Sequence, residues 1–310
     1  MSNLYDLIIL GGGPAGLSAG VYAGRAGLKT VILEKGLYGG QMQNTEEVEN
    51  YPGIRHTVGP ELSEWMSKHV EDFEVEKKYG EVQKVELEGK LKQVHLEDEV
   101  LTARTVIVAT GANPKKLGVP GEEEFSGRGV SYCAICDGAF FKNKELIVVG
   151  GGDSAVEEGT FLTRFASHVE IVHRRDKLRA APILQKKAMA NEKVGFTWFH
   201  TVCEIRGDKK VEEVVLENTQ DGSKKTVKAD GVFIYVGMTP NTSFLKGSPL
   251  LDGQGYIPTN EEMETAIPGV FAAGDVRAKK LRQIITAAGD GAIAGMNAYH
   301  YIEAQSEVVK

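Results

Sequence analysis

The chain has 310 residues, 42% of them hydrophobic and 25% charged, which is ordinary globular usage and enough chain for about two domains. Its 36 lysines and arginines against 43 aspartates and glutamates give a net charge of −7. This argues against a nucleic-acid partner, because such proteins usually carry a basic face. The apolar run 7–10 breaks at once into glycines, so we expect neither a signal peptide nor a membrane span and favour a cytoplasmic location.

The first predicted elements form a β-α-β unit. We expect a short apolar strand at 5–10, a glycine-rich turn at 11–16, an alanine-rich helix at 17–25 and a second strand at 30–33. A strand, a tight turn and a helix in this order are the setting in which a glycine fingerprint binds a dinucleotide.

The turn contains the complete fingerprint G-x-G-x-x-G, at Gly11, Gly13 and Gly16. The first glycine permits the tight turn, the second lets backbone approach a pyrophosphate, and the third lets the helix pack on the strand. Such turns also occur where close packing alone demands them, but the flanking elements favour nucleotide binding. Glu34 lies 23 residues after Gly11, where a carboxylate binds a ribose diol and repels a 2′-phosphate. The first site is therefore predicted to take an unphosphorylated adenosine.

A C-x-x-C pair, Cys133 and Cys136, comes next. The chain has three cysteines, too few for a disulfide scaffold, and structural zinc would require a second pair of ligands. A disulfide across so short a loop would add little stability, so a redox-active pair is predicted. Cys203 is expected to be a buried bystander. Asp137 is either a general acid/base or a turn-capping residue before Gly138, and residue type alone does not decide between them.

The β-α-β pattern then returns. A strand is expected at 145–149, a glycine turn at 150–152, a helix at 155–165 and a strand at 169–172. The second fingerprint has alanine at its third position, which is an allowed small residue. The chain therefore contains a diverged repeat.

The second fingerprint carries cations where the first carries its acid. Counting 23 residues from Gly150 reaches His173. Forked guanidinium groups suit the 2′-phosphate of NADPH, so NADPH is favoured over NADH. The alternatives are a solvated basic helix start with Asp176 as counter-charge, or an NAD-type acid at Glu170, which lies mid-strand rather than at the strand end. The predicted cationic cluster is His173, Arg174, Arg175 and Arg179.

Both halves continue in the same way. Each is predicted to have a further strand, at 105–110 and 231–236, and small antiparallel sheets before it that include 93–96 and 214–216.

The segment from Pro249 onwards adds a strand at 269–273 and a small-residue helix at 284–299. It is too small to form a domain by itself, so it needs a partner domain.

Together, the two fingerprints and the motifs 133–138 and 173–175 closely resemble the low-molecular-weight, prokaryote-type thioredoxin reductases, which are class II pyridine nucleotide-disulfide oxidoreductases. The resemblance covers nearly the whole chain. Further motifs that carry it are Gly39-Gly40-Gln41, Glu49-Asn50-Tyr51-Pro52-Gly53, Ala109-Thr110-Gly111, Gly274-Asp275 and Arg282-Gln283.

This resemblance implies an α/β fold of two Rossmann-like, three-layer ββα dinucleotide-binding domains. An NADPH domain at 115–244, carrying the C-x-x-C pair, is inserted into a discontinuous FAD domain at 1–114 and 245–310. The implied FAD residues are Gly11, Gly13, Pro14, Ala15, Glu34, Gly40, Gln41, Asn50, Thr110, Gly111, Gly274, Asp275, Arg282, Gln283 and Ile284. The implied NADPH residues are Gly150, Gly152, Asp153, Ser154, Ala155, His173, Arg174, Arg175 and Arg179.

The resemblance also implies a reaction. Hydride passes from NADPH to the flavin, the reduced flavin reduces the disulfide, and the dithiol reduces thioredoxin. Cys136 is implied as the flavin-facing sulfur, Cys133 as the attacking thiol and Asp137 as the group that handles the proton. Ile135 departs from the commonest threonine, which could alter the redox potential or the choice of partner but leaves both sulfurs in place.

The resemblance implies a homodimer and a rotation of the inserted domain, with hinges near 113–119 and 239–246. Other readings stay open: a relative that reduces a peroxiredoxin or another thioredoxin-like protein, an oxidase of a small dithiol, or a non-catalytic nucleotide sensor in which the dithiol is idle.

Overall fold

The computed structural model describes residues 4–45, 48 and 50–307, and for residues 44, 135, 136 and 307 the description stops at the backbone. The chain divides into two compact units, which are described separately: the first unit is Met1–Asn113 with Thr239–Lys310, and the second unit is Pro114–Met238. The second unit is thus inserted into the first. Its boundaries lie at 113/114 and 238/239, against the predicted boundaries at 114/115 and 244/245.

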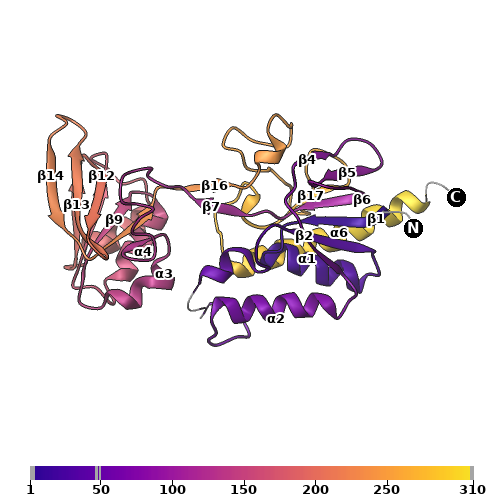
Figure 1. The fold of residues 1–310 in the computed structure, drawn as a ribbon, viewed down its shortest axis with the longest axis horizontal. Coiled ribbons are helices and arrows are strands. Elements are labelled where there is room, and N and C mark those ends of the chain that lie inside the picture. The colour runs from indigo at the N-terminus through magenta and orange to yellow at the C-terminus, as the bar shows by residue number, and fades with distance from the viewer. Residues whose placement is uncertain (1–3, 46–47, 49, 308–310) are drawn as a thin grey trace. The chain divides into compact units, whose positions relative to one another are not determined.

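The first unit is built on a mostly parallel sheet. Over its described residues the sheet has seven strands, in the order β3-β2-β1-β6-β5-β4, with β17 paired to β6 (Figure 1). Its strands are β1 (Leu4–Leu10), β2 (Thr30–Glu34), β3 (Glu76–Tyr79), β4 (Lys84–Glu86), β5 (Lys92–His95), β6 (Val100–Val108) and β17 (Val270–Ala272). Its helices are α1 (Pro14–Arg25), α2 (Gly59–Glu71), α6 (Ile284–Glu307) and the short 3₁₀ turns η1 (Gly40–Asn44), η3 (Ser243–Leu245) and η4 (Gly274–Val276).

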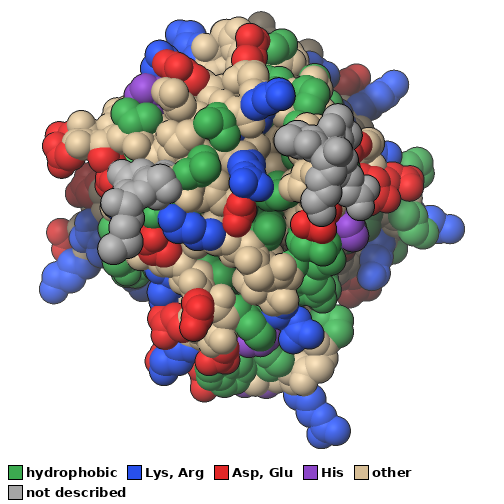
Figure 2. Space-filling model, turned by 90° about the vertical axis from the view of Figure 1, so that its right-hand side faces the viewer, with side chains coloured by type: hydrophobic (Ala, Val, Ile, Leu, Met, Phe, Trp, Pro, Cys, Tyr) green, Lys and Arg blue, Asp and Glu red, His purple; other side chains and the backbone are tan. Residues whose placement is uncertain are grey.

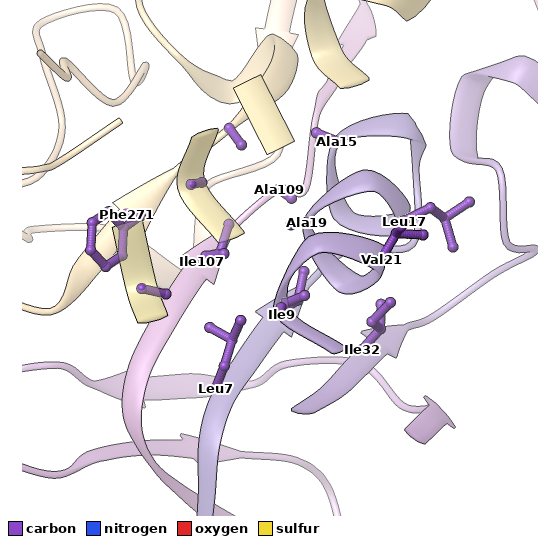
Figure 3. Packing of buried hydrophobic residues seen from close by; sticks show 14 of the residues in the cluster. Leu7, Ile9, Ala15, Leu17, Ala19, Val21, Ile32, Ile107, Ala109 and Phe271 are labelled. Carbon is purple, nitrogen blue, oxygen red and sulfur yellow. The ribbon is translucent and has the colours of Figure 1, made fainter. Parts of the chain in front are cut away.

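The core of this unit lies between the sheet and α1. Leu7 and Ile9 of β1, Ile32 of β2 and Ile107 of β6 point into it, and Phe271 of β17 closes one side (Figure 3). All five side chains are buried. Parallel strands that are covered on both faces consist mostly of consecutive apolar residues. This is why β1 is a continuous apolar run in the sequence. The packing brings the carboxyl ends of β1 and β2 beside the start of α1.

Helix α6 packs closely on α1. A Cβ atom built on Gly291 would lie 2.0 Å from the carbonyl oxygen of Ala15, and one built on Gly295 would lie 2.7 Å from that of Ala19. Small residues at these positions therefore let the two backbones approach. The helix continues to residue 307, eight residues beyond the predicted end at 299, because the sequence there lacks a breaker and contains good helix formers.

The second unit repeats the plan with a separate antiparallel layer. Over its described residues it has a five-stranded parallel sheet, in the order β11-β10-β9-β15-β8, and a three-stranded antiparallel sheet, β12-β13-β14. Its strands are β8 (Val130–Ser131), β9 (Glu145–Gly150), β10 (His168–His173), β11 (Val194–Trp198), β12 (His200–Gly207), β13 (Val211–Asn218), β14 (Lys224–Lys228) and β15 (Gly231–Tyr235). Its helical segments are α3 (Ala134–Asp137), η2 (Gly138–Phe141), α4 (Asp153–Leu162) and α5 (Pro182–Met189).

The α/β class and the two dinucleotide-binding folds are confirmed. One feature of the predicted sheets is wrong: in the first unit the antiparallel strands do not form a sheet of their own. Strand β6 begins at residue 100 rather than 105; its residues 100–103 pair with β5 on one side, and residues 102–108 pair with β1 on the other. This length joins β4 and β5 to the main sheet. The helix predicted at 155–165 is found at 153–162.

Two short segments connect the two units of the chain. Strands β7 (Ala112–Pro114) and β16 (Met238–Pro240) pair with each other as a two-stranded sheet. The amide of Lys115 donates to the carbonyl of Gly237 at 2.9 Å, and the amide of Asn241 donates to that of Gly111 at 3.0 Å. Both connections therefore run side by side where the chain passes from one unit to the other.

Figure 2 shows acidic and basic side chains interspersed over one face of the molecule, as the net charge of −7 leads one to expect. Among the helices that the structure describes, none combines the length and the apolar character needed to cross a bilayer.

Candidate nucleotide-binding and redox sites

The turn after β1 is shaped by its glycines. Gly11 has a φ of +108°, and a Cβ atom built on it would lie 2.4 Å from the carbonyl oxygen of Ala109. A Cβ atom on Gly16 would lie 1.8 Å from the carbonyl oxygen of Gly11, so the helix is in close contact with the turn. Gly13 instead faces open space. Pro14 and Ala15 begin α1, whose first N–H groups have no intrahelical acceptor and can bind a pyrophosphate here.

Glu34 ties this turn to the end of β2. Its Oε2 accepts a hydrogen bond from the Gly12 amide at 2.7 Å and its Oε1 accepts one from the Gly36 amide at 2.8 Å. Each carboxylate oxygen keeps a second lone pair that can accept from a ribose hydroxyl. Glu34 therefore holds this loop in place, a structural role that its spacing from the fingerprint did not reveal. The same two hydrogen bonds orient its carboxylate for the predicted contact with a ribose.

Gln41 and Asn50, two further predicted residues of the first unit, each donate a hydrogen bond to another side chain. Gln41 Nε2 donates to Asn113 Oδ1 at 2.8 Å, and Asn50 Nδ2 donates to Gln283 Oε1 at 3.0 Å. Gly40 lies against the fingerprint, since a Cβ atom built on it would be 3.3 Å from the Gly13 Cα atom. Glu49, the first residue of one family motif, lies outside the described residues.

Thr110 and Gly111 are held by a residue that sequence reasoning missed. Thr110 Oγ1 donates to the Asn241 carbonyl at 2.8 Å, and Asn241 Nδ2 donates back to the Thr110 carbonyl at 2.9 Å. Gly111 has a φ of +68°, which favours glycine. The signal was present, because an asparagine and a proline trail the last strand of each half, at 113–114 and 240–241.

Asp275 and Arg282 leave polar atoms without partners. Among the described residues, Asp275 Oδ1 and Arg282 Nε are buried side-chain atoms that make no hydrogen bond. Burial raises the pKa of Asp275, while the charges of Lys279 and Arg282 act in the opposite direction. Buried polar groups are nearly always paired, so these two atoms mark a place where a polar ligand fits. Ile284 follows at the first residue of α6 and packs beside Met42.

The loop that carries Asp275 is fixed to α6 by Asp290, a second residue that was missed. Asp290 pairs with Arg277 at 2.9 Å and with Lys279 at 2.8 Å, and its Oδ2 accepts from the Gly274 amide at 3.0 Å. No periodic pattern distinguishes Asp290 from other acids of a helix. Its role follows from tertiary contact only.

The second fingerprint lines a cavity of about 160 Å³ inside the second unit. A Cβ atom on Gly150 would lie 2.5 Å from the Tyr235 carbonyl oxygen, whereas Gly152 faces open space. Asp153 Oδ1 accepts from the Ala181 amide at 2.6 Å, which anchors the segment beyond the cationic cluster. Among the residues lining the cavity are Gly152, Asp153, Ser154, Ala155, Arg179, Tyr132 and Tyr235.

His173 does not contribute charge to the predicted cluster. It is 5% exposed, its Nε2 lies 3.0 Å from the Lys177 carbonyl, and a Cβ atom on Gly151 would touch its ring. Burial lowers the pKa of His173, which favours the neutral imidazole, while its hydrogen bonds to the Lys177 and Gly150 backbone act in the opposite direction. This corrects the expectation of a fourth cation. The positive charge belongs to the exposed side chains of Arg174, Arg175 and Arg179.

The carboxylate of Glu170 contacts side chains of its own sheet. It accepts a hydrogen bond from Thr197 Oγ1 at 2.6 Å and pairs with His168 Nε2 at 3.1 Å. Both partners belong to strands β10 and β11. Its mid-strand position and these contacts argue against the NAD-type alternative.

The C-x-x-C segment forms the short helix α3 after β8. Cys133 is disulfide-bonded, and Cys203 is a free cysteine whose thiol donates to the Val215 carbonyl at 3.4 Å. The side chains of Ile135 and Cys136 lie outside the described part of the structure. The amide of Cys133 donates to Ser131 Oγ at 3.1 Å.

Asp137 is joined to this segment through the same serine. Ser131 Oγ donates to Asp137 Oδ2 at 2.5 Å. Asp137 precedes η2, but within the described residues its carboxylate makes no capping hydrogen bond there. These contacts disfavour the turn-capping alternative.

Glu158, on α4, gives a pH-dependent prediction for this region. Burial raises its pKa from 4.5 to about 7, and Glu157 adds to the shift. The fold therefore binds a proton that the unfolded chain releases, so stability falls as the pH rises between about 4.5 and 7. Glu158→Gln is expected to raise the free energy of unfolding at pH 8 by up to about 3 kcal/mol, with little change near pH 4.5.

Urea unfolding of both proteins across this pH range measures the difference. Glu192→Gln, at an exposed position just beyond α5, is the matched control and should show a flat difference. A difference for Glu158→Gln that does not grow with pH would show that this carboxyl titrates normally in the fold.

Comparison with known proteins agrees with this geometry. The family described as "Pyridine nucleotide-disulphide oxidoreductase" matches residues 5–291. A thioredoxin reductase of Listeria innocua is 57% identical over 99% of this chain and 97% of its own, and one of Bacillus subtilis is 55% identical over 99% and 98%. The crystal structure of a thioredoxin reductase from Streptococcus pyogenes, 55% identical, superposes with a TM-score of 0.81 over 98% of this chain and 100% of its own.

Proposed function

This chain belongs to the pyridine nucleotide-disulphide oxidoreductase family, and from that premise we propose that it is an NADPH-dependent thioredoxin reductase. The observation that carries the proposal is that one unit holds the disulfide-bonded Cys133, a fingerprint-lined cavity and the exposed arginines. Disulfide reduction by a nicotinamide nucleotide requires a dithiol and a nucleotide site, which the second unit holds. It also requires the other fingerprint, which the first unit holds.

Thioredoxin reductases of this family use FAD and NADPH. FAD is proposed to bind the first unit, where Glu34 takes the ribose, the turn 11–15 takes the pyrophosphate, and the unpaired Asp275 carboxylate takes a ligand hydroxyl. The other proposed FAD residues are Gly40, Gln41, Asn50, Thr110, Gly111, Gly274, Arg282, Gln283 and Ile284. When bound, the flavin supplies the two-electron chemistry that links a hydride donor to a disulfide.

NADPH is proposed to bind the second unit. The fingerprint at 150–155 faces the cavity, and Arg179 also lines it. Arg174 and Arg175 are exposed nearby in sequence, where forked donors can hold a 2′-phosphate. His173 supports this site by packing under Gly151 rather than by charge.

The two cysteines are proposed to exchange disulfides with thioredoxin. The Cys133 thiolate attacks the thioredoxin disulfide and forms a mixed disulfide, and Cys136 then displaces the reduced thioredoxin while the pair returns to its disulfide. Asp137, whose Oδ2 accepts a hydrogen bond from Ser131, is proposed to give or take the proton at the leaving sulfur. The connections near 113–119 and 239–246 are proposed as hinges that let the dithiol and the nicotinamide alternate at the flavin.

We also propose a cytoplasmic homodimer, which follows from the family resemblance and from the cysteine usage.

The proposal is tested by anaerobic spectroscopy and turnover. The purified protein should be yellow, NADPH should bleach it, and oxidised thioredoxin from the same organism should then drive NADPH consumption that saturates with thioredoxin. If the colour bleaches but thioredoxin drives no consumption, the disulfide substrate is another protein or a small dithiol compound.

A further inference from the structure

Tyr235, the last residue of β15, joins the redox segment to the rest of the second unit. The amide of Ala134 donates a hydrogen bond to the Tyr235 hydroxyl at 2.6 Å, across a sequence separation of 101 residues. Ala134 directly follows Cys133 and is fully buried. A buried amide without an acceptor is costly, so this contact matters for the position of α3.

The same residue also forms part of the nucleotide site. Tyr235 pairs with Gly150 in the parallel sheet, and a Cβ atom on Gly150 would lie 2.5 Å from the Tyr235 carbonyl oxygen. Tyr235 also lines the fingerprint cavity, together with Gly152 and Ala155. One residue therefore touches both the first glycine of the fingerprint and the residue after Cys133.

The hydroxyl is held in its neutral form. Burial, with Glu158 and Asp137 nearby, keeps the pKa of Tyr235 well above its ordinary value. The oxygen therefore accepts the Ala134 hydrogen bond as a phenol throughout the working pH range. This contact is present in the state in which Cys133 is disulfide-bonded.

We propose that Tyr235 is a positioning residue for the redox-active pair: its hydroxyl holds the start of α3 in the geometry of the disulfide state and connects that geometry to the nucleotide turn. The inference rests on the proposed function and deepens it. Reduction of the disulfide takes two electrons and two protons and gives two thiols. Removing the hydroxyl should disfavour the disulfide relative to the dithiol, because in this proposal the Ala134 amide depends on that acceptor more in the disulfide state, where the S–S bond fixes the start of α3, than in the dithiol state.

The test is a redox titration of Tyr235→Phe as the flavin-loaded protein. Both proteins are equilibrated in dithiothreitol buffers of stepped ratio, free thiols are alkylated, and the added mass is measured. Cys203, which is free, supplies a constant label as an internal standard. We expect the equilibrium constant to shift about tenfold toward the dithiol, which is about 30 mV for this two-electron couple.

Tyr132→Phe is the matched control. Tyr132 precedes Cys133 and lines the same cavity, but its hydroxyl donates to Glu122 at 2.7 Å instead of accepting from α3. The disulfide/dithiol couple of Tyr132→Phe should keep the reduction potential of the parent protein. An unshifted potential in Tyr235→Phe, or an equal shift in both variants, overturns the proposal for Tyr235.

Hydrogen exchange gives a second readout that does not depend on a variant. In the unaltered disulfide form the Ala134 amide should exchange slowly, and exchange at the rate of an unprotected amide would contradict the contact. The two proposals fail differently. If no reversible two-thiol couple titrates at all, the reductase proposal is wrong, whereas a normal couple without a shift refutes only the role of Tyr235.

Discussion

Replacing Cys133 by serine is expected to lower NADPH-dependent reduction of thioredoxin by at least about a thousandfold, because the variant has no disulfide to reduce and no thiolate to attack with. Bleaching of the yellow protein by NADPH should persist, since the residues proposed to hold both nucleotides are unchanged. Steady-state turnover and anaerobic titration of the same preparation measure the two properties separately.

Cys203→Ser is the matched control. Cys203 lies in β12, is free, and donates to the Val215 carbonyl, so its loss should leave turnover close to that of the parent. Turnover of Cys133→Ser within tenfold of the parent would mean that the dithiol is idle. That result would overturn the proposed route of electrons through Cys133 and Cys136.

The second large effect concerns the choice of nucleotide. The parent protein is expected to prefer NADPH over NADH by tenfold or more, which corresponds to about 1.4 kcal/mol. Replacing Arg174 and Arg175 together by alanine should raise the KM for NADPH by about a hundredfold or more, since hydrogen bonds to charged groups contribute about 1.5–3 kcal/mol each and the contacts of two side chains are lost. The KM for NADH should hardly change.

Arg164→Ala controls for the loss of positive charge from this unit. Arg164 is exposed just beyond α4 and lies over the Phe161 ring, away from the residues that line the cavity. Arg164→Ala should therefore keep the parent KM values for NADPH and for NADH. Equal use of NADPH and NADH by the parent would overturn the assignment of the arginine cluster to a 2′-phosphate.

Local motifs made much of this molecule predictable. A strand, glycines and a helix follow each other within about thirty residues of a βαβ unit, so the two fingerprints and Glu34 can be recognised without tertiary information. The α/β class and the insertion of one nucleotide-binding fold into another are confirmed by the structure. The C-x-x-C pair was recognisable because both of its cysteines lie within four residues.

What could not be predicted depends on residues far apart in the chain. Asn241 reaches Thr110 across 131 residues, and Tyr235 reaches Ala134 across 101. The burial of His173 under Gly151 removed a charge that the sequence pattern had suggested. Spacing from a fingerprint locates the end of a strand, but it does not say whether the side chain there faces solvent or the core.

The proposed reaction requires that electrons from NADPH leave the protein as thioredoxin thiols. A single-turnover experiment tests this directly: the anaerobic protein receives a limiting amount of NADPH, oxidised thioredoxin is added, and the thiols on thioredoxin are counted by alkylation. We predict two thioredoxin thiols for each NADPH oxidised, as a two-electron disulfide reduction requires. Complete oxidation of the NADPH with thioredoxin left as a disulfide would contradict the account.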